Sequence, residues 1–255
     1  MQKMKIGIIG TGAIGGTIAK KMAAAGHLVK VYNTAEFDTL KERARQLGAT
    51  PSTLNDIAKD VDVLILSIPV AAIPKLPKTL FAGIPEHVIV VDTSNYYPFR
   101  DGEIEELKKG MVESVWVAGQ IGRPVIKAFN NLLAASLEHG GKPGNADDRI
   151  AMAISGDDQK AKETISRLIN DAGFDAVDVG SLAESWRHQP GTPAYCTELN
   201  AAALKQALSD GVKENAPGIR DIAISTFMEL PSQPSHEETV KLNRSLFSKN
   251  PKDFK

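Results

Sequence analysis

The chain is poor in cysteine, because Cys196 is the single cysteine among its 255 residues. One cysteine cannot form a disulfide within the chain, and it supplies no cluster of metal-binding thiolates. We therefore expect a metal-free protein of a reducing compartment, with the cytoplasm as its location. Cys196 is expected to be a small buried hydrophobic residue, because no base is placed to activate its thiol.

An excess of charge of one sign is also missing. The 30 Lys and Arg residues stand against 31 Asp and Glu residues, which leaves a formal net charge of −1. Such a chain has no global basic field that would gather nucleic acid or an acidic membrane surface. We therefore expect neither nucleic acid nor a membrane among its partners, and a small molecule instead.

Long hydrophobic runs are absent as well. The longest apolar stretch, residues 63–74, is far shorter than the roughly 20 residues that span a bilayer, and prolines interrupt it. Residues 1–16 resemble a signal peptide only superficially, because glycines break the apolar run and Lys20 and Lys21 follow it. Neither stretch predicts a membrane anchor or a targeting segment.

The remaining composition is that of an ordinary folded protein. Hydrophobic residues make up 42% and charged residues 24% of the chain, which argues against disordered, collagen-like and coiled-coil classes. At about 150 residues per domain, the length predicts one large domain, or one domain with a smaller appendage.

The first 180 residues alternate short β-rich runs with helical patterns. Residues 61–68 and 88–91 are nearly continuous apolar runs, as expected for strands buried on both faces of a parallel sheet. Gly26, Gly48 and Gly173 are placed to end three of the intervening helices. The pattern predicts an α/β fold of Rossmann type, with a doubly wound, mostly parallel sheet. The predicted strands cover residues 5–9, 28–32, 61–68, 88–91, 125–129, 150–155 and 174–179, and the predicted helices cover 14–25, 37–47, 103–109 and 161–169.

From Leu182 onward the sequence predicts helices and no strand. Thr192 followed by Pro193 has the form of an N-cap and a first helical position, and predicts a helix that continues through Leu204 and Leu208. Two weaker helices are expected at 219–230 and 237–248. We therefore place a boundary near residue 180, between a dinucleotide-binding domain (1–180) and a C-terminal helical part with a polar tail (181–255).

A G-x-G-x-x-G motif lies between the first predicted strand and the first predicted helix. Its residues are Gly10, Thr11, Gly12, Ala13, Ile14 and Gly15. The first glycine permits a tight turn, the second lets a pyrophosphate approach the backbone, and the third lets the helix pack closely on the strand. The N-terminus of the helix then offers N–H groups and a positive dipole to the phosphates. The motif in this context predicts dinucleotide binding.

The end of the second predicted strand bears on the choice of cofactor. NAD-binding proteins usually carry an acidic residue there to bind the ribose 2′-hydroxyl, whereas this chain has Asn33 and Thr34. A 2′-phosphate is therefore not repelled, which favours NADP and leaves NAD possible. Lys41 and Arg43 on the following helix could reach back to this phosphate, but we expect them to belong to a solvated face.

Further segments extend the match beyond the glycine turn, namely 67–69, 91–95, 125–130, 155–158 and 186–192. With them the sequence resembles the NADP-dependent deazaflavin-coenzyme oxidoreductase family, in particular a bacterial subgroup of it. The resemblance covers about residues 5–208. It implies a Rossmann domain with a small C-terminal helical part, a homodimer, and hydride transfer between NADP(H) and a planar flavin- or deazaflavin-like acceptor.

The resemblance also implies which residues bind the cofactor. It places the glycine turn around the pyrophosphate and Asn33 with Thr34 at the adenosine 2′ position, while the remaining residues follow the cofactor toward the nicotinamide. Family members commonly have Arg at position 35, and the chain departs from them with Ala35. The remaining implied residues are Ser67, Ile68, Pro69, Asp92, Ser94, Asn95, Ala128, Phe129 and Asn130.

Hydride transfer between two planar rings needs them stacked in contact and needs little acid–base help from the protein. We therefore expect no catalytic side chain. Trp186, Arg187, His188 and Gln189 combine an aromatic face, a guanidinium and an amide, and we expect them to fold back over the cofactor and bind the acceptor. For His188, a loop packed against the sheet is an equal alternative.

Two other functions remain open from the sequence. A 3-hydroxyacid dehydrogenase or imine reductase would open with the same glycine turn, and Lys127 with Asn131 would be its tempting catalytic pair. Lys127, however, lies in a β-rich run, whereas the catalytic lysine of those enzymes lies on a helix beyond the Rossmann domain. A non-catalytic sensor of the nicotinamide redox state is the second alternative.

Overall fold

An eight-stranded sheet forms the centre of the computed structural model, which describes residues 3–247. The strands lie in the order β3-β2-β1-β4-β5-β6-β7-β8. They are β1 (Lys5–Ile9), β2 (Leu28–Tyr32), β3 (Thr50–Pro51), β4 (Val63–Leu66), β5 (Ile89–Asp92), β6 (Ile126–Lys127), β7 (Ala151–Ser155) and β8 (Asp175–Gly180). Every neighbouring pair is parallel except β6 and β7. This confirms the predicted Rossmann-type, mostly parallel sheet, and the order of the first six strands is that of the dinucleotide-binding fold.

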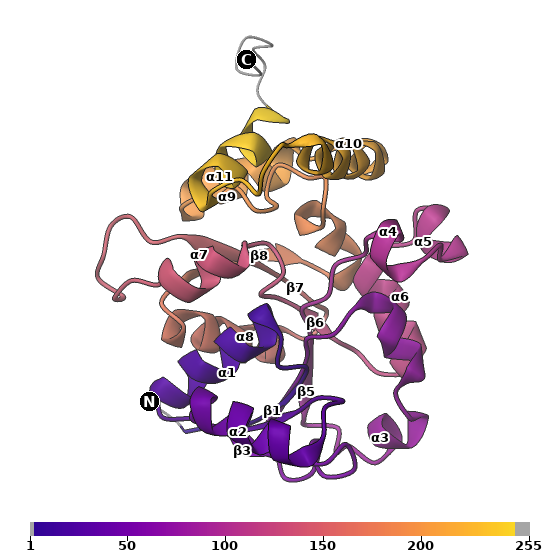
Figure 1. Cartoon of the computed structure of the whole chain (residues 1–255), viewed down its shortest axis with the longest axis vertical. Helices are drawn as coiled ribbons and strands as arrows, with labels where there is room; N and C mark the ends of the chain where they lie inside the picture. Colours follow the sequence, from indigo (N-terminus) through magenta and orange to yellow (C-terminus); the bar gives the residue numbers. More distant parts are fainter. Residues whose placement is uncertain (1–2, 248–255) are drawn as a thin grey trace.

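Helices cover both faces of the sheet (Figure 1). One side carries α1, α2, α7 and α8, and the other carries α3 to α6. Their bounds are α1 (Ala13–Ala24), α2 (Phe37–Leu47), α3 (Lys78–Ala82), α4 (Pro98–Asp101), α5 (Glu105–Lys108), α6 (Glu113–Ile121), α7 (Ala134–His139), α8 (Gln159–Asp171), and the 3₁₀ helix η1 (Val70–Lys75).

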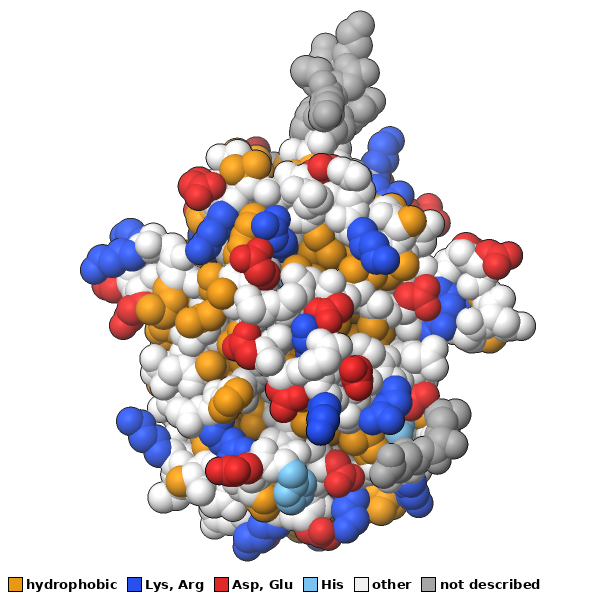
Figure 2. All heavy atoms as spheres, turned by 180° about the vertical axis from the view of Figure 1, so that it is seen from behind, with side chains coloured by type: hydrophobic (Ala, Val, Ile, Leu, Met, Phe, Trp, Pro, Cys, Tyr) orange, Lys and Arg blue, Asp and Glu red, His pale blue; other side chains and the backbone are white. Residues whose placement is uncertain are grey.

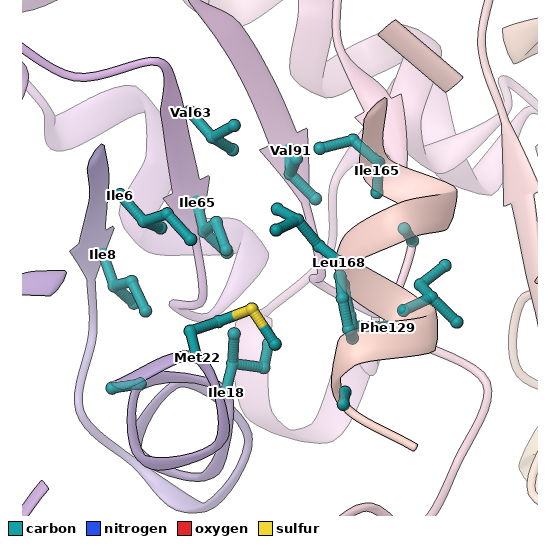
Figure 3. Close-up of a cluster of buried hydrophobic side chains, with 14 of the residues drawn as sticks. Ile6, Ile8, Ile18, Met22, Val63, Ile65, Val91, Phe129, Ile165 and Leu168 are labelled. Atoms are coloured by element: carbon teal, nitrogen blue, oxygen red, sulfur yellow. The ribbon is translucent and has the colours of Figure 1, made fainter. Parts of the chain in front are cut away.

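Two apolar clusters, one on each face, hold these layers together. In the cluster of Figure 3, Ile6 and Ile65 of neighbouring strands face Ile18 of α1 and Leu168 of α8, all at most 1% exposed. All four residues of β4 are buried, because each face of this central strand contacts a helical layer. The continuous apolar runs of the sequence are explained by this two-sided burial.

The C-terminal helices gather at one end of the molecule (Figure 1). They are η2 (Leu182–His188), α9 (Ala201–Asp210), η3 (Lys213–Asn215), α10 (Ala216–Glu229) and α11 (His236–Ser245). The apolar side of α9 packs against β7 and β8, so the helical part is attached to the edge of the sheet. The division into domains at residue 180 stays a prediction.

The predicted helix start at Thr192 is wrong. The Thr192 hydroxyl donates to the carbonyl of Gln189, and the chain remains irregular until Asn200 caps α9 by accepting from the N–H of Ala203 at 2.9 Å. Cys196 and Glu198 have positive φ angles of 56° and 50° between these points, and this conformation interrupts a helix. The predicted helices 219–230 and 237–248 correspond to α10 and α11, although residue 248 lies outside the described part.

Other boundaries also differ from the prediction. The strand expected at 125–129 is reduced to the two residues of β6, because Phe129 takes a positive φ of 59°. The strand β3 and the helices α3, α4, α6 and α7 had no counterpart in the prediction.

Within residues 3–247, no helix is long and apolar enough to cross a membrane. The face shown in Figure 2 carries basic and acidic side chains intermixed, without a broad field of either sign.

Candidate cofactor site

A cavity of about 350 Å³ opens at the carboxyl ends of β1, β4, β5 and β6. This cavity is called the cleft below. Ligands of open α/β sheets bind at this edge, where the strand order reverses. Its lining residues are Gly12, Ala13, Ile14, Ser67, Ile68, Pro69, Thr93, Ser94, Asn95, Tyr97, Arg100, Phe129, Asn130, Leu132, Leu133, Ala134, Tyr195 and Cys196.

The three glycines of the turn play different roles. Gly10 has a φ of 104°, and a Cβ there would lie 2.1 Å from the carbonyl oxygen of Ser67. A Cβ on Gly15 would lie 2.1 Å from the carbonyl oxygen of Gly10, so only glycine lets α1 start this close to β1 and β4. Gly12 differs, because its φ is −68° and a Cβ would meet nothing within 4 Å. The space beside Gly12 is open toward the cleft.

The beginning of α1 suits an anion. No side chain caps this helix, and no acidic residue lies in its first turn. Its first N–H groups and its dipole therefore remain available for a phosphate beside Gly12, Ala13 and Ile14. The residues fit the pyrophosphate of a dinucleotide.

At the adenosine end, Asn33 is fixed between the turn and its own loop. Its Nδ2 donates to Thr11 Oγ1 at 2.6 Å, and its Oδ1 accepts from the N–H of Ala35 at 2.9 Å. Thr34 follows it at the end of β2. Neither side chain carries a negative charge that would repel a 2′-phosphate.

The prediction of a fully solvated Arg43 is wrong. Arg43 is half-buried, and its guanidinium Nη2 lies 3.4 Å from the Thr11 carbonyl oxygen, which places a cation beside the glycine turn. The sequence analysis considered Arg43 and left it out of the site, although its spacing pointed inward. Position 43 follows the buried Leu40 by three residues and precedes the buried Leu47 by four, so it lies at the edge of the inward face of α2.

The structure brings most of the remaining predicted cofactor residues together. Ser67, Ile68 and Pro69 after β4, Ser94 and Asn95 after β5, and Phe129 and Asn130 after β6 all line the cleft. Asp92 and Ala128 do not, because both are fully buried beneath it.

Asp92 belongs instead to a buried charge cluster. Its Oδ2 lies 3.1 Å from Lys127 Nζ and accepts from Ser114 Oγ at 2.6 Å, while its Oδ1 accepts from Ser94. Lys127 also donates to the carbonyl of Ser94. The pair supports the loop that follows β5, and the buried Asp92 side chain does not reach the cleft as the predicted cofactor contact required. Nearby, burial raises the pKa of Glu113 to about 7.

His188 lies in a buried network under the cleft. Its Nδ1 is 2.8 Å from Asn130 Oδ1, and its Nε2 is 2.8 Å from Ser155 Oγ. Burial lowers the pKa of His188 to about 3, so the imidazole is neutral. Because the amide oxygen only accepts, Nδ1 carries the proton and Nε2 accepts from the serine. His188 therefore positions Asn130 and does not reach the cleft.

The other residues of the predicted acceptor segment also lie elsewhere. Trp186 is buried, with the guanidinium of Arg187 stacked 4.5 Å from its ring centre. Arg187 donates to Glu184 and to the carbonyl of Leu208, which ties η2 to α9. Gln189 does not line the cleft. Residues 186–189 thus do not line the cleft, because η2 packs into the molecule, and their role toward the acceptor stays a prediction.

Two tyrosines that the sequence analysis did not single out face the cleft instead. The hydroxyls of Tyr97 and Tyr195 lie 2.6 Å apart, and Asn95 Nδ2 donates to the Tyr195 hydroxyl at 3.3 Å. Burial raises the pKa of both tyrosines, so both stay protonated. Arg100 lies over the Tyr97 ring at 5.2 Å. No sequence spacing links Tyr97 to Tyr195, since 98 residues separate them.

Cys196 is buried next to Tyr195, and burial raises the pKa of its thiol to about 12. It is therefore an unreactive thiol that lines the inner wall of the cleft, in line with the expectation from the sequence. Residues 3–247 contain no group of three or more His, Cys, Asp or Glu side chains that could hold a metal ion.

Comparisons with known proteins show which chains this one resembles. Protein YjhV of Escherichia coli strain K12 is 36% identical over 110 residues, which cover 43% of this chain and 80% of that protein. The crystal structure of the hypothetical protein SMa0349 from Sinorhizobium meliloti is 28% identical with a TM-score of 0.65, over 78% of this chain and 96% of that chain.

A third protein, from Arthrobacter sp. FB24, is provisionally assigned as an F420-dependent NADP reductase. It shares 18% identity and a TM-score of 0.58 over 88% of this chain and 94% of its own, which is a likeness of fold. Residues 5–96 match the model of the family described as NADP oxidoreductase coenzyme F420-dependent. The chain belongs to this family and is an NAD(P)-dependent oxidoreductase.

Proposed function

We propose that the cleft binds NADP(H) and that the protein transfers a hydride between NADP(H) and a planar, flavin- or deazaflavin-like acceptor. The observation that carries this proposal is the open, uncapped start of α1 beside Gly12, with Arg43 held against the same turn at Thr11. A dinucleotide pyrophosphate and a 2′-phosphate would each meet positive electrostatic potential there.

The chain's own residues would bind and orient the cofactor. Gly12, Ala13 and Ile14 would hold the pyrophosphate, while Ser67 to Pro69, Phe129 and Asn130 would line the nicotinamide end of the cleft. When bound, the cofactor supplies the hydride. The protein would fix the ring and exclude water from its exposed face, which is the part of such a reaction that a scaffold provides.

Arg43 would determine the preference for NADP. A charge-assisted hydrogen bond to the 2′-phosphate contributes about 1.5 to 3 kcal/mol, which corresponds to roughly tenfold to a hundredfold in affinity. In calorimetric titrations, Arg43→Gln should weaken NADP⁺ binding by this factor and leave NAD⁺ binding nearly unchanged.

The matched control is Arg45→Gln on the same helix. Arg45 is exposed and pairs with Glu42 at 2.7 Å, so this variant should bind both cofactors like the parent protein. Equal NADP⁺ affinity in all three proteins would contradict the role of Arg43. A parent protein that binds neither cofactor would contradict the proposed function itself.

The alternative functions gain no support from the site. A hydroxyacid dehydrogenase or imine reductase that used Lys127 would need its ammonium group in the cleft, whereas this side chain is 1% exposed and paired with Asp92. A redox sensor would bind NADPH without oxidising it. Turnover of NADPH with an artificial flavin or quinone acceptor distinguishes the proposed oxidoreductase from such a sensor.

We further propose that the protein is a cytoplasmic homodimer. The family resemblance supports the dimer, and the single buried thiol of Cys196 supports a reducing location. Sedimentation equilibrium tests the dimer, and the expected result is a mass of two chains. Cell fractionation tests the cytoplasmic location.

A further inference from the structure

The cleft continues into two further cavities toward the C-terminal helices. An inner chamber of about 120 Å³ shares Tyr97, Tyr195 and Cys196 with the cleft. An outer groove of about 660 Å³ shares Tyr97 with both and Phe227 with the chamber. The three spaces thus adjoin one another, and Tyr97 lines all three. Figure 1 shows α10 above α4, and both helices contribute residues to the lining of the outer groove.

The outer groove is apolar and aromatic. Its hydrophobic lining consists of Phe99 on α4, Ile224, Phe227 and Met228 on α10, and the nearby Leu230 and Pro234. Its other lining residues are Tyr97, Ser232, Gln233 and Thr239, so none of the side chains that line it carries a charge. Phe99 and Met228 are 64% and 69% exposed, respectively. Large apolar side chains exposed together mark a surface that binds an apolar partner.

The junction between the groove and the cleft is polar. The Tyr97 and Tyr195 hydroxyls share one hydrogen bond, and Tyr195 also accepts from Asn95. Whichever tyrosine donates to the other, the pair retains one O–H for a further acceptor atom. Arg100, which also lines the cleft, adds a guanidinium that is partly exposed. This end therefore suits a carbonyl oxygen or a partial negative charge on a planar ring.

We propose that the groove and the junction form the subsite of the acceptor, and that this acceptor is an aromatic carbonyl compound of quinone type with a hydrocarbon substituent. The inference rests on the proposed NADP(H) binding and hydride transfer, because the ring must reach the cleft, and it assigns a quinone in place of the flavin-like acceptor proposed above. Its polar head would lie at Tyr97 and Tyr195, and its hydrocarbon chain would lie along Phe227 and Met228. A flavin nucleotide fits the outer groove less well, because no cation lines that groove for its phosphate, and Arg220, which lines the chamber, already pairs with Asp221 at 2.8 Å.

The test compares two probes with the same ring: a methyl-substituted benzoquinone with a hexyl chain and the same quinone without the chain. Their dissociation constants are measured by equilibrium dialysis against the full chain, first without cofactor and then with NADP⁺. Burial of a hydrocarbon chain predicts binding of the hexyl compound that is at least about tenfold tighter. Riboflavin 5′-phosphate is the third probe and should bind more weakly than the hexyl quinone.

Two variants of α10 locate the binding surface. Phe227→Gln changes a residue that lines both the chamber and the groove, and it should remove most of the advantage of the hexyl compound. Ile222→Gln is the matched control, because Ile222 is 58% exposed on the same helix and does not line the groove. Circular dichroism of both variants checks that they fold.

Equal affinity for the two quinones, or an equal effect of the two variants, would overturn the inference. Tighter binding of riboflavin 5′-phosphate would overturn it in favour of a charged acceptor. If sedimentation shows that Phe227→Gln, and not Ile222→Gln, dissociates a dimer, the groove is an interface with a second copy of this chain. That result would also overturn the inference. The affinity of the parent protein for NADP⁺ is measured in parallel. If NADP⁺ does not bind, the proposed function itself fails; if NADP⁺ binds and the quinone results fail, only this inference fails.

Discussion

The Nδ1–H of His188 donates to Asn130 Oδ1 at 2.8 Å, and so connects a fully buried imidazole to a residue that lines the cleft. Asn130 in turn donates through Nδ2 to Asn95 Oδ1 at 3.0 Å and to the His188 carbonyl at 2.7 Å. The loops after β5 and β6 are therefore held together by amide groups that His188 orients. This relationship makes the site sensitive to a residue that no ligand would touch.

The first prediction is a pH dependence of stability that comes from His188. Its pKa is lowered to about 3 in the folded protein and returns to 6.5 on unfolding. Between these values the unfolded chain binds a proton that the folded protein excludes, so the contribution of His188 to stability is complete above pH 6.5 and is lost as the pH falls toward 3. The loss is about 1.4 kcal/mol per pH unit.

Urea unfolding of the parent protein and His188→Gln between pH 4 and pH 6 checks this. The difference in the free energy of unfolding between the two proteins should grow with pH at about that slope. Groups common to both, such as Glu113, cancel in the difference. A difference that does not change with pH would mean that the imidazole is not excluded from protonation in the folded state.

The second prediction separates two glycines of one motif. Gly12→Asp should fold with a stability within about 1 kcal/mol of the parent, because Gly12 has an ordinary φ and open space. It should bind NADP⁺ at least about a hundredfold more weakly, because its carboxylate would repel the pyrophosphate.

Gly10→Ala should behave in the opposite way. The positive φ of Gly10 and the 2.1 Å approach to Ser67 predict a loss of stability of about 3 kcal/mol or more. Thermal unfolding combined with calorimetry compares the variants. Unimpaired NADP⁺ binding by folded Gly12→Asp would exclude the glycine turn as the pyrophosphate site.

The third prediction concerns cofactor preference at the end of β2. Asn33→Asp should shift binding toward NAD, because an aspartate accepts from the ribose 2′-hydroxyl and repels a 2′-phosphate. Ala35→Arg should shift it toward NADP by adding a bidentate phosphate contact. Each change should alter the ratio of the two dissociation constants by roughly tenfold to a hundredfold. An unchanged ratio in both variants would place the adenosine elsewhere.

The fourth prediction assigns Trp186 a structural role. Truncation to Ala would remove a buried ring that stacks on Arg187 and lies beside Gly211, at a cost of about 3 kcal/mol in unfolding free energy. At a temperature where the variant is folded, its affinity for the quinone and cofactor probes should match that of the parent. A selective loss of acceptor binding would restore the role expected from the sequence.

The contrast between Trp186 and the glycine turn shows what the sequence could predict. The turn is a local feature, since its three glycines, the strand before it and the helix after it lie within 20 residues, and the apolar runs of the strands are equally local. These patterns predicted the mostly parallel sheet and the residues of the glycine turn, whereas the other predicted residues that line the cleft were implied by the family resemblance.

Features that depend on distant segments were not predictable in the same way. Tyr97 contacts Tyr195 only because the chain after β8 turns back over the sheet. The spacing of hydrophobic residues in the sequence does not predict this turn. The indole ring of Trp186 is of a type that stacks on planar ligands, but the packing of η2 buries it inside the molecule. Thr192 has the sequence pattern of a helix cap, but its hydroxyl donates to the carbonyl of Gln189, and Asn200 caps the helix instead.

The last prediction tests Lys127, the residue on which the alternative dehydrogenase mechanism depends. The structure places its ammonium group 3.1 Å from Asp92 Oδ2, with side chains that are 1% and 0% exposed. Lys127→Met would leave the Asp92 carboxylate buried without a counter-ion, which should cost about 3–5 kcal/mol in the free energy of unfolding.

Replacing both partners removes that unpaired charge. The double variant Lys127→Met with Asp92→Asn should therefore regain at least about half of the lost stability, whereas Asp92→Asn alone leaves the ammonium group of Lys127 unpaired and should be destabilised. Because neither side chain lines the cleft, the folded double variant should bind NADP⁺ with the affinity of the parent and still oxidise NADPH with an artificial quinone. A stable double variant that binds the cofactor but has lost all turnover would show that Lys127 takes part in the chemistry, and would favour the dehydrogenase alternative over hydride transfer between stacked rings.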